Sequence, residues 1–356
     1  MHWLLAPKLK FSRDEFDTLR GFAMLAVVAH HVALWLDKGL AAQLADSSVM
    51  VELIQYQSTV LQPLRLPLFT ILSGFIYAHR PVQSKTAIPF INGKFRRILI
   101  PLFFVSCVTY LKDVFIAGNV PSYKYEGVVY EVAAQDFWVL WFFHYKHLWF
   151  LQALMIIFGL VLLLDLLKQM NTLKSWLFWV AVFTALPYVF EGSSLWSTTK
   201  TAHLAVYFFI GLGFYRFRET FTKSRWLLPI AWLVFFAMML LNIAWKLDIV
   251  ELTDTRLMYV LAGASGSYCL LNLHLSLNWL AWIGSFSYTI YLYHGLGMET
   301  HLLFDNLLHH GSAGHLLWFV LTLGFGVIIP IGIHKVFEKI PLIRTPVLGK
   351  RLLNTK

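Results

Sequence analysis

Residues 19–36 read LRGFAMLAVVAHHVALWL, a run of about the length that an α-helix needs to cross a bilayer. Within it, Arg20 and His31 are eleven positions apart, so on a helix both side chains leave the same face, about 20° apart in direction and about 16 Å apart along the axis. Ionisable side chains cost free energy inside a bilayer and commonly mark functional sites there. The pair is therefore our first candidate for a functional site.

The composition indicates that this run is one of many membrane spans. Of the 356 residues, 58% are hydrophobic and 13% are charged, whereas about 25% of a soluble chain is charged; the mean hydropathy is +0.64. We predict an all-α fold, a polytopic integral membrane protein whose bundle of about ten transmembrane helices makes a single transmembrane domain over residues 1–356. The expected spans lie near residues 18–36, 58–78, 96–117, 147–167, 174–190, 201–216, 226–245, 256–273, 279–297 and 314–337.

Lys and Arg are distributed unevenly between the two sides of these spans. The connecting segments on the side of both termini hold 21 of the 29 Lys and Arg residues, and the opposite segments hold seven. The positive-inside rule then places both termini in the cytoplasm. The net charge of +10 reflects this topology and contact with the anionic inner leaflet, so we do not expect nucleic-acid binding.

No residue pattern predicts a disulfide framework or a bound metal. Cys107 and Cys269 each fall within an expected span and form no CxxC pair. A group of His and Asp residues before the last span is better explained as a solvated outer loop than as a metal site. Its members are Asp305, His309, His310 and His315. The N-terminal residues also lack the pattern of a cleavable signal peptide, so the first span is expected to be the membrane anchor.

A layer of polar residues is predicted in the outer half of the membrane. The first span runs from inside to outside, which puts His31 roughly two-thirds of the way across. In the ninth span Ser287, Tyr291 and His294 lie within about 40° of one another on one face, with His294 at a depth similar to that of His31. A helix bundle has to turn such groups inward. Hydrogen bonding between helices is the alternative role for this face.

Three other residues lie near this layer. Arg65, from the outward end of the second span, and His147, at the outward start of the fourth, are candidates to join it. The alternative for His147 is an ordinary place at the membrane interface. His30 points about 80° away from the direction of Arg20, and we expect it to pack between helices rather than to act in the site.

A second polar cluster is expected at the cytoplasmic surface. Arg20 opens the first span, and Arg96 and Arg97 open the third, with further cations just before them. Guanidinium groups bind phosphates through paired hydrogen bonds, and helix N-termini offer free N–H groups. This face therefore suits an anionic ligand that carries phosphate. The alternative is that Arg96 and Arg97 fix the topology and reach phospholipid headgroups.

Polar groups at two depths fit two classes of protein. An enzyme would bind a charged donor at the cytoplasmic surface and carry out the reaction in the outer half of the membrane. A transporter or flippase would instead pass a lipid-linked sugar or a small anion along the same groups. The sequence shows no internal repeat of the kind found in many transporters, although Pro63 and Pro67 leave room for a broken helix in the second span. The transporter is kept as the alternative.

Five segments form an ordered set along the chain. They read FDTLRGFAMLAVVAHH at 16–31, LPLFTILSGF at 66–75, KFRRILIP at 94–101, HLWFLQAL at 147–154 and IGSFSYTIYLYH at 283–294. Together they resemble the membrane-bound acyltransferase 3 family, whose first helix carries an Arg and a His separated by ten residues, as Arg20 and His31 are. A single motif such as LSGF is weak evidence for the family, but the ordered set of five segments is specific to it.

The resemblance implies a ten-helix bundle in a bacterial inner membrane. Such proteins move an acyl group, usually acetyl, from cytoplasmic acetyl-CoA to a sugar hydroxyl of an envelope glycan. Acceptors in the family include lipopolysaccharide O-antigen, exopolysaccharide, enterobacterial common antigen and peptidoglycan. The expected partners are therefore membrane lipids, an acyl-CoA co-substrate and a glycan acceptor, with no permanently bound cofactor.

Two features depart from parts of that family. Some members carry a C-terminal extracytoplasmic hydrolase-like domain, whereas this chain ends shortly after its last expected span, so we expect the standalone form. Other members have a Glu pair in the fourth span where this chain has Gln152 and Ala153. This difference makes the chain similar to the exopolysaccharide-modifying or fucose-acetylase-like branch.

The chemistry and the resemblance together assign roles to the candidate residues. A sugar hydroxyl needs a base near pH 7, which an imidazole supplies, and we assign this role to His31, either as base or as transient acyl carrier. Arg20 orients the donor or His31, and Arg20, Arg96 and Arg97 bind the phosphates of CoA. The remaining candidates position the acceptor or the oxyanion, or line the wall: Ser287, Tyr291, His294, His147 and Arg65. Transfer of acyl chains longer than acetyl is a third hypothesis.

Overall fold

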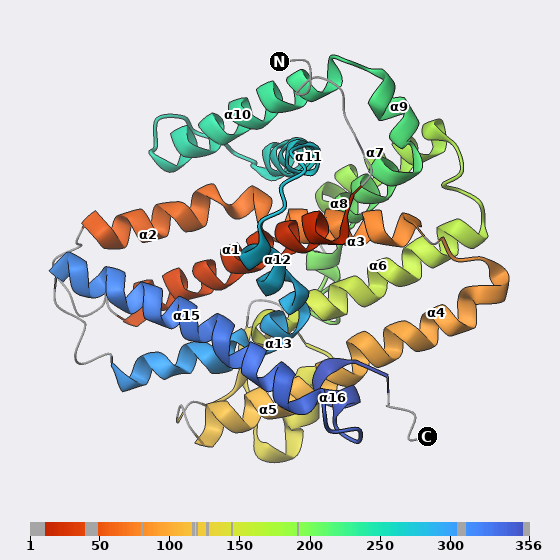
Figure 1. The fold of residues 1–356 in the computed structure, drawn as a ribbon. Helices are drawn as coiled ribbons and strands as arrows, with labels where there is room; N and C mark the ends of the chain where they lie inside the picture. The colour runs from red at the N-terminus through yellow and green to blue at the C-terminus, as the bar shows by residue number, and fades with distance from the viewer. Residues whose placement is uncertain are drawn as a thin grey trace. The chain divides into compact units, whose positions relative to one another are not determined.

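The computed structural model describes residues 11–351, apart from 40–48, 80, 116–117, 119, 126–127, 144, 191 and 305–310. The chain forms two compact units, each made of two separate pieces of sequence. Unit 1 contains Met1–Ala78 and Ile210–Ile331, and unit 2 contains His79–Phe209 and Gly332–Lys356. Helices make up almost all of the described structure in both units (Figure 1).

Unit 1 contains helices and turns but no strand in its described residues. Its N-terminal piece forms α1 (Arg13–Gly39), α2 (Val49–Val60), the 3-10 turn η2 (Gln62–Leu64) and α3 (Leu66–His79). Its second piece forms α9 (Arg218–Lys223), α10 (Leu227–Lys246), α11 (Arg256–Asn272), α12 (Asn278–Ser285), α13 (Ser287–Met298), the 3-10 turn η7 (Glu299–Leu303) and most of α15 (Gly311–Phe337). The first and ninth expected spans therefore belong to the same unit.

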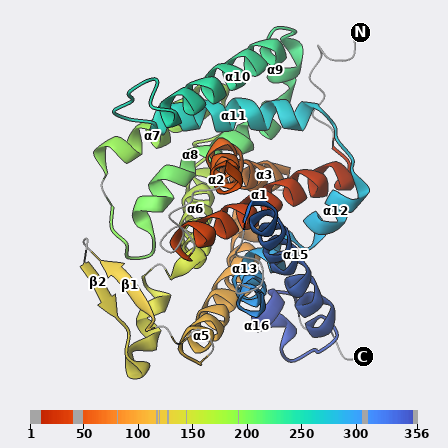
Figure 2. The same cartoon turned by 90° about the vertical axis from the view of Figure 1, so that its left-hand side faces the viewer.

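Unit 2 combines helices with a small hairpin. Its helices are α4 (Ala87–Lys94), α5 (Ile100–Phe115), α6 (Trp149–Leu166), α7 (Leu173–Val189), most of α8 (Thr198–Arg216) and α16 (Arg344–Leu348). Its shorter turns are η3 (Ser84–Thr86), the π-helical η4 (Phe95–Leu99), η5 (Ala134–Trp141) and η6 (Lys146–Leu148). Strands β1 (Ser122–Tyr125) and β2 (Val128–Glu131) pair antiparallel, with Tyr123 opposite Tyr130 (Figure 2). The hairpin is a small departure from the predicted all-α fold.

The predicted spans are helical in the structure, but they differ in how well they fit a membrane. Six helices of the described chain are long and apolar enough to cross one: Arg13–Leu36, Val49–His79, Ser84–Phe115, Lys146–Leu166, Leu227–Lys246 and Ala313–Phe337. This confirms a helical, multi-pass membrane protein. The count of about ten spans and the side on which each terminus lies stay predictions.

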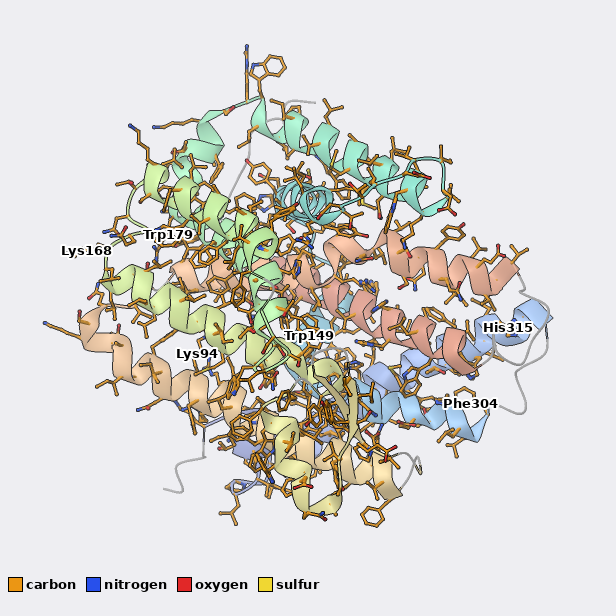
Figure 3. The ribbon with its side chains drawn as sticks, turned by 180° about the vertical axis from the view of Figure 1, so that it is seen from behind. Lys94, Trp149, Lys168, Trp179, Phe304 and His315 are labelled. Atoms are coloured by element: carbon orange, nitrogen blue, oxygen red, sulfur yellow. The ribbon has the colours of Figure 1, made fainter. Side chains whose placement is uncertain are left out.

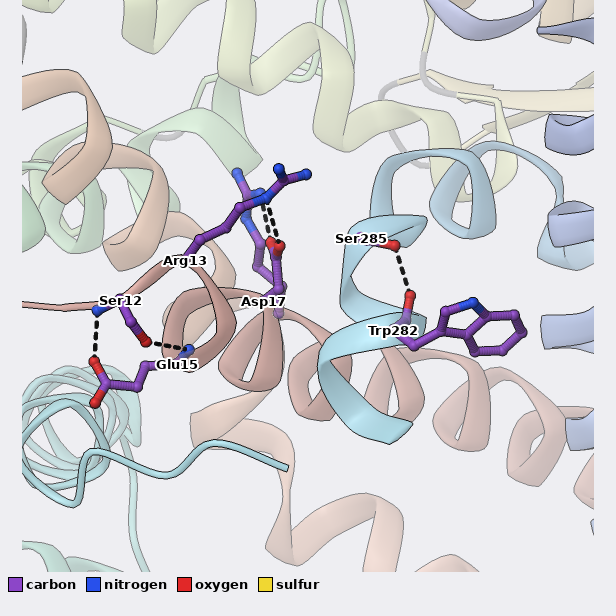
Figure 4. A network of polar contacts seen from close by, with 7 residues as sticks. Ser12, Arg13, Glu15, Asp17, Trp282 and Ser285 are labelled. Carbon is purple, nitrogen blue, oxygen red and sulfur yellow. Dashed lines mark hydrogen bonds and ion pairs between the residues drawn. The ribbon is translucent and has the colours of Figure 1, made fainter. Parts of the chain in front are cut away.

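Helix α1 begins where its sequence supplies a cap. The backbone N–H of Ser12 donates to Glu15 Oε2 at 2.7 Å, and the N–H of Glu15 donates to Ser12 Oγ at 3.2 Å (Figure 4). This reciprocal pair is a capping box, which satisfies N–H groups that the first helical turn leaves without partners. The cap fixes the start of the helix that carries both Arg20 and His31.

The second and ninth expected spans are each interrupted. The second segment begins at Val49, well before residue 58, and breaks between α2 and α3. Pro63 lies in the break, where its missing N–H and fixed φ favour a turn over a continuous helix. The ninth segment divides at Phe286. There the Ser285 hydroxyl donates to the Trp282 carbonyl at 2.7 Å (Figure 4), a local bond that competes with the helical pattern.

Glycines allow α1 and α12 to pack backbone against backbone. A Cβ on Gly284 would overlap the carbonyl oxygen of Asp17 and lie 2.8 Å from the nitrogen of Gly21. A Cβ on Gly21 would overlap the carbonyl of Leu280. Such close approach is typical of helix pairs in membranes. The N–H that begins α12, from Leu277, donates to Thr18 Oγ1 at 3.1 Å. These contacts hold the ninth segment against the helix of His31.

Unit 2 contains a buried group of charged residues. Lys112 Nζ and Lys146 Nζ lie 2.8 and 2.5 Å from Asp113 Oδ1, and the Tyr145 hydroxyl donates to the other oxygen of the same carboxylate. Because Asp113 is almost completely buried, these partners replace the water that its charge would otherwise need. The group ties α5 to the turn η6, which leads into α6.

Candidate functional site

Helix α1 carries Arg20 and His31 without interruption, as their spacing requires. The His31 ring is half-buried, with its centre 5.0 Å from the centre of the His294 ring on α13. It also lies 5.3 Å from the ring of its neighbour His30. The structure therefore brings together the two imidazoles that were expected at one depth, and it adds a third beside them.

His294 is held in one tautomer by its own helix. It is 1% exposed, and its Nδ1 lies 2.9 Å from the Tyr291 carbonyl oxygen and 3.1 Å from that of Ile290. A carbonyl oxygen only accepts, so Nδ1 carries the hydrogen and donates to it. In the neutral ring, Nε2 of His294 therefore has the lone pair. A nitrogen fixed in this way is suited to orient a neighbouring group that has an N–H or O–H.

The other two predicted residues of this face lie on the same short helix. Ser287 is the first residue of α13, because the break at Phe286 separates it from α12. Tyr291 follows one turn later, with its ring centre 6.5 Å from that of His294. Ser287 and Tyr291 are both buried. The predicted polar face thus exists on α13, and it turns into unit 1.

Arg65 lies at the break between η2 and α3, where its side chain is 7% exposed. Its Nη1 donates to Ser58 Oγ at 3.4 Å, and Ser58 Oγ lies 2.6 Å from Nδ1 of His30. Arg65 has no acidic partner among the described residues. A buried guanidinium without a carboxylate is costly in free energy, so its position next to the imidazoles marks a place suited to negative charge.

Sequence reasoning did not predict the contact between His30 and Ser58. His30 was expected to pack between helices, and its ring does contact α2 through Ser58, which also accepts from Arg65. Pro63 was the signal available in the sequence, because a proline predicts a break in the helix between Ser58 and Arg65. Helical spacing across an unbroken span did not predict this meeting.

Helices α10 and α11 add neutral polar groups to the same region of unit 1. The fully buried Asn242 donates from Nδ2 to the carbonyl of Thr59 at 3.3 Å. The Tyr259 hydroxyl donates to Asn242 Oδ1 at 3.5 Å, and Tyr259 is close enough to Arg65 to interact with its charge. These contacts fix the segment that contains Ser58 and the break after it.

Ser58→Ala is expected to destabilise unit 1. The change leaves His30 Nδ1 and Arg65 Nη1 without the oxygen they share, at a cost of about 1 kcal/mol in the free energy of unfolding. Unfolding of the purified protein in detergent measures the loss. Ser265→Ala is the matched control, because the Ser265 hydroxyl donates to carbonyls of its own helix. Equal stability of the two variants would show that the shared oxygen contributes nothing.

Arg20 is paired with an acidic residue of its own helix. Its Nη1 lies 3.3 Å from Asp17 Oδ1, and Arg13 Nε lies 3.4 Å from Asp17 Oδ2, in the ion pair shown in Figure 4. The Arg20 side chain is 36% exposed. Because a guanidinium has five N–H donors, this bond leaves Arg20 able to contact another anion.

Arg96, Arg97 and His147 lie in unit 2. Arg96 and Arg97 occupy the π-helical turn η4, between α4 and α5. Pro101 follows closely and has no N–H for the carbonyl one turn before it, which favours a local change in helical pattern. His147 lies in the turn η6, directly after Lys146, whose φ is 48°. Such unusual backbone is found more often near functional sites.

Aromatic rings accompany the lysines of this unit. Lys94 Nζ lies 3.3 Å from the centre of the Phe158 ring, and Lys200 Nζ lies 4.5 Å from that of Trp149; Lys94 and Trp149 are labelled in Figure 3. Burial lowers the pKa of Lys200 to about 8. The contact with Phe158 gives Lys94 a cation–π partner next to the π-helical turn η4.

No group of three metal-ligating residues occurs in the part of the chain that the structure describes. Of the loop residues weighed as ligands, Asp305, His309 and His310 lie outside the described residues. The expectation of a solvated loop was wrong for His315, which is buried within α15. The expectation of a metal-free site thus stays a prediction for that loop.

Comparison with known families identifies the class of protein. Residues 13–335 match the model of the acyltransferase 3 family, which is described as an acyltransferase domain. The chain belongs to this family, and it is accordingly a membrane acyltransferase. No curated protein and no solved structure was found to match the chain.

Proposed function

We propose that this protein transfers an acetyl group from cytoplasmic acetyl-CoA to a sugar hydroxyl of a cell-envelope or exported polysaccharide. The observation that carries the proposal is the half-buried His31 with its ring centre 5.0 Å from that of His294, in a chain of an acyltransferase family. Thioester-to-hydroxyl transfer needs a base at the acceptor. A half-buried imidazole supplies one at neutral pH.

The proposed reaction assigns each group a step. His31 takes the proton of the sugar hydroxyl while the sugar oxygen attacks the thioester carbonyl. The C–S bond then breaks, the CoA thiolate leaves and receives the proton from His31, and the acetyl group remains on the sugar oxygen. His294, with its lone pair on Nε2, orients His31. An acetyl-imidazole on His31 is the second route.

The negative charge that develops on the carbonyl oxygen needs a partner. Arg65 is the candidate, because it is a buried guanidinium that donates to the neutral Ser58 and has no acidic partner among the described residues. Ser287 and Tyr291 are proposed to position the acceptor. His147 is proposed as a wall residue on the basis of its sequence position alone.

The donor is proposed to bind through guanidinium groups. Arg96 and Arg97 are proposed to bind the phosphates of CoA. For Arg20 the proposal rests on its sequence position alone, and the role is to orient the donor or His31. The uneven distribution of Lys and Arg supports a multi-pass protein of the bacterial inner membrane with both termini in the cytoplasm. This topology exposes the cytoplasmic arginines to the acyl-CoA pool.

Glycan from a strain that lacks this protein tests the proposal. Mass spectrometry of its exported polysaccharides is expected to show polymer of normal amount without the acetyl ester. Complementation with the wild-type chain restores the ester. Polysaccharide retained inside the cell would instead support a transporter or flippase, and acetylated, exported polysaccharide in the deletion strain would refute the transferase.

A further inference from the structure

The segment after α15 folds into a fixed turn. Helix α16 is capped by Gly349, whose φ of 64° is left-handed and whose N–H donates to the Thr345 carbonyl at 2.8 Å. The Thr345 hydroxyl donates to the Lys350 carbonyl, also at 2.8 Å. Lys350 Nζ in turn lies 3.0 Å from Glu338 Oε2 and 2.7 Å from His334 Nε2. The turn is therefore fastened to the end of α15.

This turn lies directly on the π-helical turn of unit 2. A Cβ on Gly349 would lie 3.0 Å from the Cα of Arg97 and 3.1 Å from its carbonyl oxygen. Helix α16 also packs against η4 and α5, and Figures 1 and 2 both show it beside α5. The chain thus brings Arg344 and Arg351, at the two ends of this turn, to the segment that carries Arg96.

Two of the arginines gathered here each have a buried donor without an acceptor among the described residues. Nε of Arg96 and Nε of Arg344 are buried and have no hydrogen-bond partner within the described structure. Arg351 is exposed, and its positive charge acts on that of Arg96. Buried N–H groups in native proteins are normally satisfied, and like charges repel one another. Both observations fit a site that is completed by an anion.

The nearby acid does not supply that anion. A hydrogen bond from Lys350 lowers the pKa of Glu338, so this carboxylate is charged and paired with Lys350. None of Arg96, Arg344 and Arg351 has an acidic partner among the described residues. The positive charge of these three guanidinium groups is therefore not balanced by a carboxylate in this part of the chain.

We infer that Arg344 and Arg351 join Arg96 in a phosphate-binding site, so that the C-terminal turn forms part of the acyl-CoA site. The inference rests on the proposed function, and it extends the site beyond the arginines of the third span. Guanidinium groups match phosphate oxygens through paired hydrogen bonds. CoA offers a diphosphate and a 3′-phosphate, which suit several guanidinium groups at once. Phospholipid headgroups carry the same chemistry and are distinguished by experiment.

Binding of radiolabelled CoA to the purified full-length protein tests this inference. Arg351→Gln changes an exposed side chain, and together with Arg344→Gln it is expected to raise the Kd for CoA by at least about tenfold. Arg351→Lys, which keeps the charge, is expected to recover part of the affinity. The matched control is Lys339→Gln, which removes an exposed cation at the end of α15 and is expected to leave the Kd unchanged. Thermal unfolding verifies that the variants are folded.

A second experiment distinguishes binding of CoA from binding of phospholipid headgroups. The same Kd is measured in nanodiscs of phosphatidylcholine with and without phosphatidylglycerol. If the arginines bind lipid phosphate, the double variant loses bound phosphatidylglycerol but keeps the wild-type Kd for CoA, and the inference is overturned. It is also overturned if the wild-type protein does not bind CoA.

The assay distinguishes this inference from the proposed function because it contains no glycan acceptor. Wild-type protein that acetylates glycan, together with a double variant of unchanged Kd and KM for the donor, would refute the C-terminal site and leave the function standing. Arginine-dependent CoA binding without any acetylation of glycan would refute the function and leave the site standing.

Discussion

His31→Ala is expected to lower the rate of acetyl transfer by a factor of about 10²–10⁴. The imidazole is the proposed base, and its loss leaves the sugar hydroxyl protonated when it meets the thioester. The half-buried ring packs at the edge of the His30–His294 group, so its removal spares the backbone contacts between α1 and α12. Initial rates with labelled acetyl-CoA, in membranes that contain equal amounts of each variant, measure the effect.

The control for this prediction is another histidine. His203 is exposed on α8, and His203→Ala is expected to keep the wild-type rate. Arg20→Ala is expected to lower transfer as well, through the donor, while the protein still accumulates in the membrane. Normal rates for both His31→Ala and Arg20→Ala would contradict the assignment of the site.

Gly284→Ala is expected to prevent unit 1 from folding. Its Cβ would overlap the Asp17 carbonyl and press on the nitrogen of Gly21. Both atoms belong to the backbone of α1, so no change of side-chain rotamer relieves the overlap, and the two helices have to separate. We expect a loss of about 3 kcal/mol or more in the free energy of unfolding. The amount of monodisperse protein recovered in detergent, measured by size-exclusion chromatography, reports the loss.

Gly324 provides the same chemical change without the clash. A Cβ at Gly324, in the interior of α15, meets nothing within 4 Å. Gly324→Ala is expected to be neutral or stabilising by about 0.5–1 kcal/mol, because alanine favours the helical state. Recovery of Gly284→Ala at the level of Gly324→Ala would show that α1 and α12 do not pack in this way.

Several features of the fold were predictable because they depend on local pattern. Apolar runs of helical length are visible in composition, and the segments predicted from them are helical in the structure. Helical spacing also placed Arg20 and His31 on one face, and put Ser287, Tyr291 and His294 on another. The depth of His31 and His294 follows from the same arithmetic, so their meeting was expected.

Other features depend on contacts that sequence spacing does not describe. The bond between His30 on α1 and Ser58 on α2 joins positions that are 28 residues apart. Arg65 was expected at the outward end of a span that began near residue 58, whereas it lies within a longer helical segment that begins at Val49 and is broken just before it.

The C-terminal turn was missed for a related reason. Arg344 and Arg351 counted as topology signals in the sequence, because positive charge at a span end usually sets orientation. Next to them Gly349 has a left-handed φ of 64°, and a Cβ at this position would lie 3.0 Å from the Cα of Arg97, so glycine suits this close approach. Only the folded chain shows that Nε of Arg96 and Nε of Arg344 are buried without a partner among the described residues.

The central claim is that His31 directs acetyl transfer from acetyl-CoA to a glycan hydroxyl. Its most direct test uses purified protein reconstituted in lipid vesicles, labelled acetyl-CoA, and polysaccharide extracted from the deletion strain as acceptor. The account predicts an alkali-labile labelled ester on the polysaccharide with the wild-type protein, and only background label with His31→Ala. Equal labelling by the two proteins, or no labelling by the wild type, would contradict it.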